Sequence, residues 1–317
     1  MTREELQASF TAEHGPTNAA AVMKLALPTA HISLDEVSAD SIPSGASRYG
    51  GEPDVPIGFV WPTCKTRRGH KPEGLVYPLT FVAQINFAEA APCIKDDPIW
   101  PSDGTLMFFF DSVCMPAGIY DPSDAEGLRL VYVPAGTPLQ RMKAPPHTPP
   151  SPCDVSKFVL NARRISFQPG WTLPEPDSES ERMIEAARES DFDCEQSVLG
   201  PPYDWKWWQP TFLYSRQPRH RLGGFAAPEQ SDPCRTCAQS AQGLFLDASG
   251  ANYPNMKKLG PGLPEAQGPW RLLLQFDLAE APESPCGYDG TQFFLCASEA
   301  SIRSRSFRAA WWSWDQD

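Results

Sequence analysis

The sequence predicts an α+β fold, mainly antiparallel β, with two duplicated β-units and peripheral helices. Three observations support this class. The chain has 35 prolines in 317 residues, and a proline inside a helix removes a backbone hydrogen bond, which argues against long helical bundles. In the most regular segments, successive side chains fall on opposite faces, and this period of two is typical of strands. A set of short motifs also occurs twice in the same order, which indicates an internal duplication.

The first element expected along the chain is a short helix. Thr2 and Glu5 match a capping box, in which each side chain binds the other residue's backbone N–H. This segment has no apolar run of the secretory type, and no later segment reaches the roughly 20 apolar residues of a membrane span. We therefore expect a cytoplasmic protein that does not contact a membrane.

The clearest internal similarity joins residues 81–90, FVAQINFAEA, to residues 272–281, LLLQFDLAEA. After each segment comes an Asp-Gly turn and an aromatic strand, starting at Asp103 and at Asp289. The two segments are offset by 191 residues and the two turns by 186. A basic residue followed by a Gly-Gly turn is also repeated upstream, at Arg48 and again at Arg221.

From these repeats we expect one compact domain over residues 1–317. Its pseudo-repeats would cover about 45–134 and 215–300. Between them, residues 135–210 would form a proline-rich connection and a helical insert, with the helix at 178–191.

The charge of the chain argues against one class of partner. The net charge is −12, and neither half carries a basic excess, whereas a nucleic-acid binder needs a basic face. Arginines do stand beside tryptophans at residues 303–314, but we favour a C-terminal strand with a solvated edge there. The expected partner is a protein or a small ligand, not a nucleic acid.

Polar residues at matching places of the two repeats are the candidate ligand-binding residues. They are Arg48, Gln84, Asn86, His220, Arg221, Gln275 and Asp277. In one interpretation they line a single pseudo-symmetric groove, where the arginines bind an anionic ligand or an acidic partner. In the other, each glutamine satisfies backbone groups where the sheet bends, and we favour this second interpretation.

His220 is the histidine that lies inside a repeated motif. It could act as a base or bind an acid, but we favour a structural role that ties the Gly-Gly turn to a neighbouring strand. The sequence has no serine-hydrolase, zinc-protease or P-loop motif. No catalytic residue is therefore assigned, and we lean away from an enzyme.

Nine cysteines without an export signal predict reduced thiols. Cys234 and Cys237 form a C-x-x-C motif, but zinc requires four ligands, and only Cys286 and His220 are candidates to complete the set. A redox pair would prefer a helix N-terminus. Because prolines and polar residues surround the motif, we favour a loop with reduced thiols and expect no cofactor.

Taken in order, these motifs resemble the YwqG-like family of bacterial proteins. The resemblance rests on the turn after Arg48, Val60-Trp61-Pro62, the strand at 81–86, the turn at Asp103 and their counterparts after His220. It covers about residues 45 to 300. It implies a mixed fold rich in antiparallel sheet, an uncharacterised function and no established catalytic residues. Members also resemble immunity or regulatory partner proteins.

Three functional hypotheses follow. The first is a non-catalytic cytoplasmic binding protein, of the immunity-partner type or a small-ligand binder. The alternative is an enzyme of unknown reaction, with a site in the groove between the repeats that includes His220, Arg221 and Asp277. The third is a protein stabilised by a metal at Cys234 and Cys237.

Overall fold

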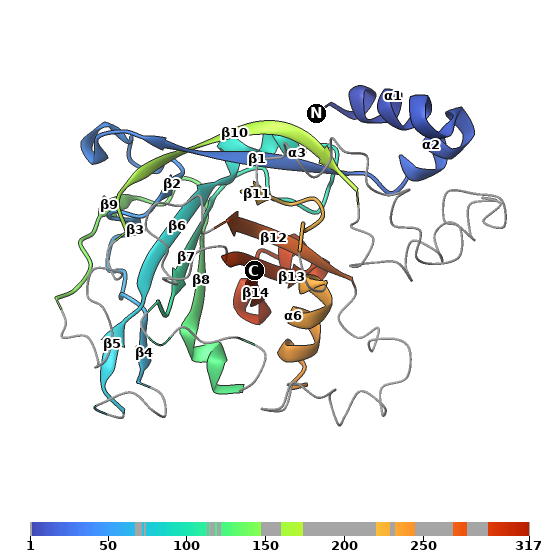
Figure 1. The fold of residues 1–317 in the computed structure, drawn as a ribbon. Helices are drawn as coiled ribbons and strands as arrows, with labels where there is room; N and C mark the ends of the chain where they lie inside the picture. The colour runs from blue at the N-terminus through green and yellow to red at the C-terminus, as the bar shows by residue number, and fades with distance from the viewer. Residues whose placement is uncertain are drawn as a thin grey trace.

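One strongly curved antiparallel sheet dominates the computed structural model of the chain (Figure 1). The structure describes residues 2–66, 72, 74–112, 114, 118, 122–146, 160–173, 220–228, 232–244, 269–277 and 291–316. The sheet has ten strands in the order β14-β13-β12-β11-β1-β10-β2-β6-β7-β8, and each neighbouring pair is antiparallel. The predicted class, α+β and mainly antiparallel, is confirmed.

The strands of the large sheet fall into a central pair and two flanking sets. The central pair is β1 (Leu27–Glu36) and β10 (Arg163–Thr172). The set beside β10, here called the first half, is β2 (Arg48–Tyr49), β6 (Thr80–Asn86), β7 (Thr105–Phe110) and β8 (Leu128–Val133). The set beside β1, the second half, is β11 (Arg221–Leu222), β12 (Trp270–Asp277), β13 (Thr291–Ser298) and β14 (Trp311–Gln316).

Smaller elements surround this sheet. Two two-stranded sheets pair β3 (Asp54–Pro56) with β9 (Leu139–Arg141) and β4 (Thr63–Lys65) with β5 (Val76–Pro78). The α-helices are α1 (Arg3–His14), α2 (Pro16–Val22), α3 (Phe87–Ile94), α6 (Pro233–Ala241) and α8 (Glu299–Arg303). The 3-10 helices are η1 (Ala39–Ser41), η2 (Pro122–Gly127) and η6 (Phe307–Ala309). Among the described residues, every helix is too short or too polar to traverse a lipid bilayer.

The predicted capping box is present at the start of α1. The Thr2 side chain accepts a hydrogen bond from the Glu5 backbone, and the Glu5 carboxylate accepts one from the Thr2 backbone. The expected strands at 81–86 and after Asp103 are also present, as β6 and β7. The helix expected at 178–191 lies outside the described residues.

The pairings in the two halves correspond closely. The ladder is irregular between Phe81 and Ala83 in β6, and again between Leu272 and Leu274 in β12, so each strand has a bulge at the same place. Further along, Gln84 pairs with Met107, and Gln275 pairs with Phe294. This register offsets β7 and β13 by 187 residues, one more than the offset of the Asp-Gly turns.

The two central strands were missed by the sequence analysis, which placed β10 inside the proline-rich connection. The reason is local, because Pro169 and Gly170 are residues that normally argue against a central strand. The structure shows why residue 170 is a glycine. A side chain at Gly170 would collide with the ring of His31 on β1, so the missing side chain makes room for a buried histidine.

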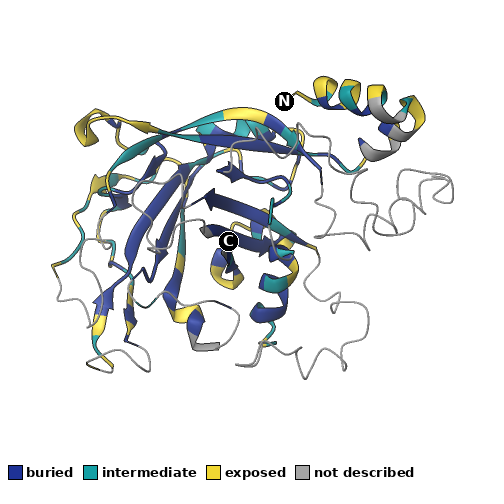
Figure 2. Ribbon diagram, viewed as in Figure 1, coloured by how far each residue is buried: buried dark blue, intermediate teal, exposed yellow. Residues whose placement is uncertain are grey.

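The main core lies where the sheet curves round and the two halves face each other (Figure 2). Aromatic rings meet across this interior. Tyr49 of β2 lies 5.6 Å from Phe276 of β12, and Phe108 of β7 lies 5.4 Å from Phe293 of β13. Since β2 and β12 are separated by three strands in the sheet, only strong curvature brings their side chains together.

The outer faces of the two halves are covered differently. In the first half a second core forms where the two small sheets pack, and it includes Val55, Trp61, Tyr77, Met107 and Phe109. In the second half, helix α6 packs against β12, β13 and β14. The two halves therefore share a frame but carry different outer layers.

The Gly-Gly turn of the first half provides a test of this packing. Gly50 has φ of +60°, and a side chain there would lie 2.8 Å from Leu160 and against the Asn161 carbonyl oxygen. Gly136, with φ of +78°, has open space around it. Gly136→Ala should therefore lose only the strain of a left-handed residue, about 1–2 kcal/mol. Gly50→Ala should lose markedly more, measured by urea unfolding; equal losses would contradict the packing described.

Candidate functional site

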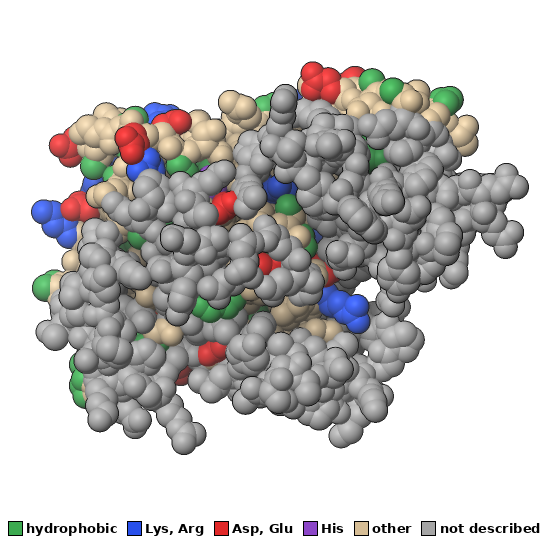
Figure 3. Space-filling view, in the orientation of Figure 1, with side chains coloured by type: hydrophobic (Ala, Val, Ile, Leu, Met, Phe, Trp, Pro, Cys, Tyr) green, Lys and Arg blue, Asp and Glu red, His purple; other side chains and the backbone are tan. Residues whose placement is uncertain are grey.

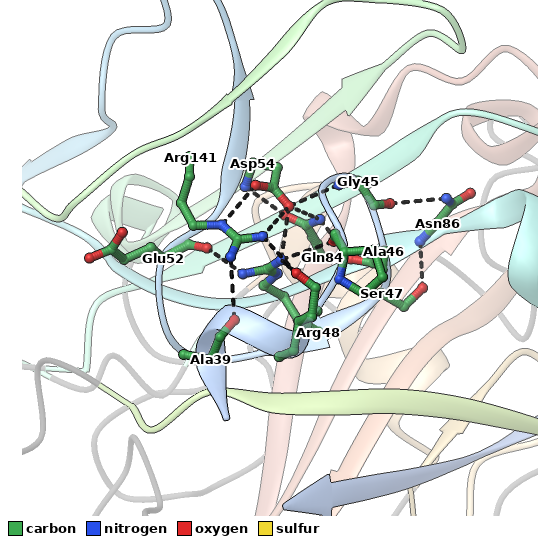
Figure 4. A network of polar contacts seen from close by, with 12 residues as sticks. Ala39, Gly45, Ala46, Ser47, Arg48, Glu52, Asp54, Gln84, Asn86 and Arg141 are labelled. Atoms are coloured by element: carbon green, nitrogen blue, oxygen red, sulfur yellow. Dashed lines mark hydrogen bonds and ion pairs between the residues drawn. The ribbon is translucent and has the colours of Figure 1, made fainter. Parts of the chain in front are cut away.

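The candidate residues of the first half gather around a buried carboxylate (Figure 4). Arg48 and Asp54 are 1% and 0% exposed, and the Arg48 Nη2 lies 2.9 Å from Asp54 Oδ2. Arg141 of β9 lies on the other side, its Nε 3.0 Å from Asp54 Oδ1. Burial lowers the pKa of Arg48 from its ordinary value, while the charge of Asp54 acts in the opposite direction. We call Arg48, Asp54, Gln84 and Arg141 the first polar cluster.

Gln84 belongs to the same cluster and uses its amide on backbone groups. Its Oε1 accepts a hydrogen bond from the Asp54 backbone N–H at 2.9 Å, and its Nε2 donates to the Ala46 carbonyl at 2.8 Å. Asn86, two residues along β6, donates to the Gly45 carbonyl and caps helix α3. Both side chains thus hold segments next to β2 against β6 through backbone groups.

The second half repeats part of this arrangement. Arg48 Nη1 donates to the carbonyl four residues ahead, at Glu52, and Arg221 Nη1 donates to the carbonyl four residues ahead, at Phe225. Gln275 Oε1 accepts from the backbone N–H of Ala227, six residues after Arg221, just as Gln84 accepts from the residue six after Arg48. Ala227 thus stands where the first half has Asp54, so this position carries no carboxylate.

His220 lies immediately before β11 and ties it to β12. Its Nδ1 accepts a hydrogen bond from the Asp277 backbone N–H at 3.0 Å, and its carbonyl accepts one from Ile32 on β1. Burial lowers the pKa of His220 to about 4, although the charge of Asp277 opposes this. Burial, followed by the charge of Arg221, also lowers the pKa of His31 to about 4.

The structure does not bring the two sets of candidate residues into one groove. Arg48 and Gln84 bind the backbone of Glu52 and Asp54, whereas Arg221 and Gln275 bind the backbone of Phe225 and Ala227, so each set contacts the segment after its own Gly-Gly turn. His220, Arg221, Gln275 and Asp277 do lie together, all 5% exposed or less. The candidates thus form two buried clusters rather than one shared binding surface.

A cavity of about 190 Å³ lies elsewhere, between helix α6 and strand β12. Asp232, Cys234, Trp270, Arg271 and Glu299 contribute to its lining, and we call it the α6 cavity. The sequence analysis missed it, although one signal was present. Arg271 is a charged residue between Trp270 and the apolar run 272–274, and a charge that is largely removed from water needs partners.

The partners of Arg271 come from distant parts of the chain. Its Nη2 lies 2.5 Å from Asp97 Oδ2, and its Nη1 lies 2.8 Å from Glu299 Oε1. Asp97 is 174 residues away in sequence, so no local pattern could have indicated the pair. The guanidinium is thereby fixed at the wall of the α6 cavity.

The prediction of a loop around Cys234 and Cys237 is wrong, because both residues lie in helix α6. Asp232 caps the helix through a bond to the Cys234 backbone, and Pro233 is its first residue. Aspartate followed by proline is itself a helix-start signal. Cys286 lies outside the described residues. Within the described ranges, no group of three or more His, Cys, Asp or Glu side chains could hold a metal ion.

The curved antiparallel sheet and its two buried polar clusters define a mainly β protein of the α+β class. Residues 47–315 match the model of a domain of unknown function (DUF1963), so the chain belongs to this family. No curated protein matches the sequence. The match begins just before β2 and ends within β14, and therefore includes both polar clusters.

Neutralising the buried carboxylate should destabilise the fold. In Asp54→Asn, the buried guanidinium of Arg48 loses its counter-ion, which we expect to lower the free energy of unfolding by about 3–5 kcal/mol. Glu36 provides the control, because its ion pair with Arg163 is at the surface and its side chain is 80% exposed. Glu36→Gln should cost less than about 1 kcal/mol. Similar losses in urea unfolding of the two variants would argue against the first polar cluster as a stabilising element.

The two buried histidines predict a loss of stability in acid. Their pKa is about 4 in the folded protein and near 6.5 in an unfolded chain. The unfolded chain therefore binds more protons between these values, and stability falls as the pH drops through that range. From pH 7 to 5, each histidine should remove about 2 kcal/mol.

His220→Asn isolates the contribution of one histidine. The asparagine Oδ1 can still accept the hydrogen bond from Asp277, but the side chain does not titrate. Urea unfolding at pH 7 and pH 5 should show a smaller acid loss for this variant, by about 2 kcal/mol. An unchanged acid loss would mean that His220 is not the source.

Proposed function

We propose that this chain is a non-catalytic binding protein that docks a protein partner through an exposed apolar turn of its first half. The observation that carries the proposal is the exposure of Ile57 and Val60, whose side chains are 72% and 84% exposed. We call residues 56–60 the apolar turn. Contiguous exposed apolar side chains on a well-packed base commonly mark an interaction site, and Ile57 and Val60 are three residues apart in this turn.

The apolar turn is held firmly by its inward-facing residues. The Phe59 backbone N–H donates to the Pro56 carbonyl at 3.0 Å, and Gly58 has φ of +81°. The Phe59 ring stacks on Phe109 with centroids 5.8 Å apart, and Trp61 meets the same ring edge-on at 5.3 Å. Because these aromatic contacts fix the turn, Ile57 and Val60 are presented with little conformational freedom to lose on binding.

The polar candidates support binding over catalysis. A catalytic group has to reach its substrate directly or through a water molecule. Arg48, Gln84 and Gln275 are at most 1% exposed, and each uses its side chain to hold the protein's own groups. The alternative, an enzyme with a site in the groove between the repeats, gains no support from this placement.

The charge also bears on the kind of partner. The net charge is −12. On the face drawn in Figure 3, the described Lys and Arg side chains are scattered rather than gathered in a basic patch. This favours a protein over a nucleic acid, because nucleic-acid binding needs a basic footprint. The resemblance to the YwqG-like family, whose members resemble immunity-type partners, supports the same proposal, and we retain a cytoplasmic location as part of it.

We further propose that the two halves are copies of one unit within a single domain. Their strand orders correspond, both halves have a bulge before the glutamine, and the contacts made by Arg48 and Gln84 recur at Arg221 and Gln275. Under this proposal the apolar turn is an addition to the first copy, since it belongs to the outer layer in which the halves differ.

Changing the apolar turn should abolish partner capture. A tagged full-length chain is used to retrieve its partner from the native host, and we expect one stoichiometric protein. Ile57→Asp with Val60→Asp should remove an anchor worth about 2 kcal/mol or more, which weakens binding by more than about tenfold. Val37 is the matched control because it is 38% exposed but lies outside the turn, after β1.

The expected pattern is capture by the wild type and by Val37→Asp, and loss in the double variant. Equal capture by all three would remove the apolar turn from the proposal. Failure of the wild type to retain any stoichiometric protein under several conditions would overturn the binding function itself.

A further inference from the structure

Three cysteine thiols meet where helix α6 packs on strand β13. Cys234 and Cys237 come from the C-x-x-C motif on α6, and Cys296 comes from β13. The sulfur atoms of Cys234 and Cys296 are 3.2 Å apart, while Cys237 and Cys296 are 0% exposed. All three are present as thiols. The motif did not point to Cys296, which is 62 residues from Cys234 in the sequence.

One of the three thiols has a route to solvent. Cys234 is 8% exposed and lines the α6 cavity, which is large enough for a small oxidant. It is also the second residue of helix α6. Asp232, Arg271 and Glu299 lie on the same cavity wall, where the Arg271 guanidinium is paired with Glu299.

The other two thiols are placed to act after Cys234. Burial raises the pKa of Cys296 well above its ordinary value, and its contacts with Cys234 and Cys237 act in the same direction. Cys296 therefore stays protonated next to Cys234. Cys237 belongs to the same cluster but does not line the cavity. This arrangement separates an accessible sulfur from a buried one that is in contact with it.

We propose that Cys234 and Cys296 form a reversible oxidation site, which takes hydrogen peroxide through the α6 cavity and closes a disulfide between helix α6 and strand β13. This site is separate from the apolar turn, which lies in the other half of the molecule. It does not depend on the proposed binding function.

The chemistry proceeds in two steps. In the first, the Cys234 sulfur attacks one peroxide oxygen; the S–O bond forms, the O–O bond breaks and water leaves, so the sulfur is oxidised to a sulfenic acid. In the second, the Cys296 sulfur attacks the Cys234 sulfur; the S–S bond forms, and the hydroxyl leaves as water with the Cys296 proton. Two thiols and one peroxide thus give one disulfide and two water molecules.

Mass spectrometry of the wild-type chain tests the site directly. The reduced, folded full-length protein is treated with hydrogen peroxide, remaining thiols are blocked, and the peptides are mapped. We expect a predominant crosslink between the peptides of Cys234 and Cys296, lighter by two hydrogens than the thiol pair and removed by dithiothreitol. Loss of this selectivity in denaturant would show that the fold creates it.

Variants distinguish the roles of the three thiols. Cys237→Ala should keep the crosslink, and so should Cys64→Ala, a control at a buried cysteine in the other core. With both Cys237→Ala and Cys296→Ala, the sulfenic acid should accumulate at Cys234 and be labelled by dimedone.

Three outcomes would overturn the proposal. These are a predominant Cys234–Cys237 linkage, sulfenic acid that appears first on Cys296, and thiols that stay reduced while peroxide oxidises an exposed cysteine peptide in the same tube.

Discussion

The ladder between β1 and β10 is the interaction on which the rest of the structure depends. Ten residues of each strand pair, from Leu27 opposite Thr172 to Glu36 opposite Arg163. The two strands are exchanged between the halves, because β1 precedes β2 but pairs with β11, while β10 precedes β11 but pairs with β2. The halves are therefore interlocked, and neither can complete its sheet without a strand that comes from beside the other.

Within this sheet, the buried polar groups form hydrogen bonds and ion pairs that hold strands to neighbouring segments of the chain. An arginine in a core is costly unless its charge is paired and its N–H groups are bonded. The first half meets this need with Asp54, whose carboxylate also binds Arg141 and accepts a hydrogen bond from the Gly45 backbone. The second half keeps the arginine and the glutamine but has Ala227 at the corresponding position. The shared contacts are those to backbone, so they follow from the path of the chain after each Gly-Gly turn rather than from a common ligand.

Local patterns in the sequence were enough for the class, the capping box of α1 and the strands around Gln84 and Gln275, because alternation and turn residues act over short distances. They were not enough for β10, where Pro169 and Gly170 suggest a loop until the ring of His31 is seen to fill the space above Gly170. Nor could they join Arg271 to Asp97, or Cys234 to Cys296, since these contacts depend on how distant segments pack. The loop expected at Cys234 was a different failure, because Asp232 and Pro233 did indicate a helix start and were taken for loop residues.

Because their outer layers differ, the two halves carry different proposed sites, the apolar turn on one and the cysteine pair on the other. Where small sheets cover β6 and β7, packing on Phe109 leaves Ile57 and Val60 outside. Where helix α6 covers β12 and β13, a cavity remains beside Cys234. Phe109 and Cys296 occupy corresponding positions in the ladders of β7 and β13. The two proposed sites therefore lie at equivalent places of the two halves. A bulky ring there anchors an apolar turn from outside, and a small thiol there leaves room for the sulfur of an overlying helix. The same sheet can thus carry the proposed docking surface on one half and the proposed oxidation site on the other.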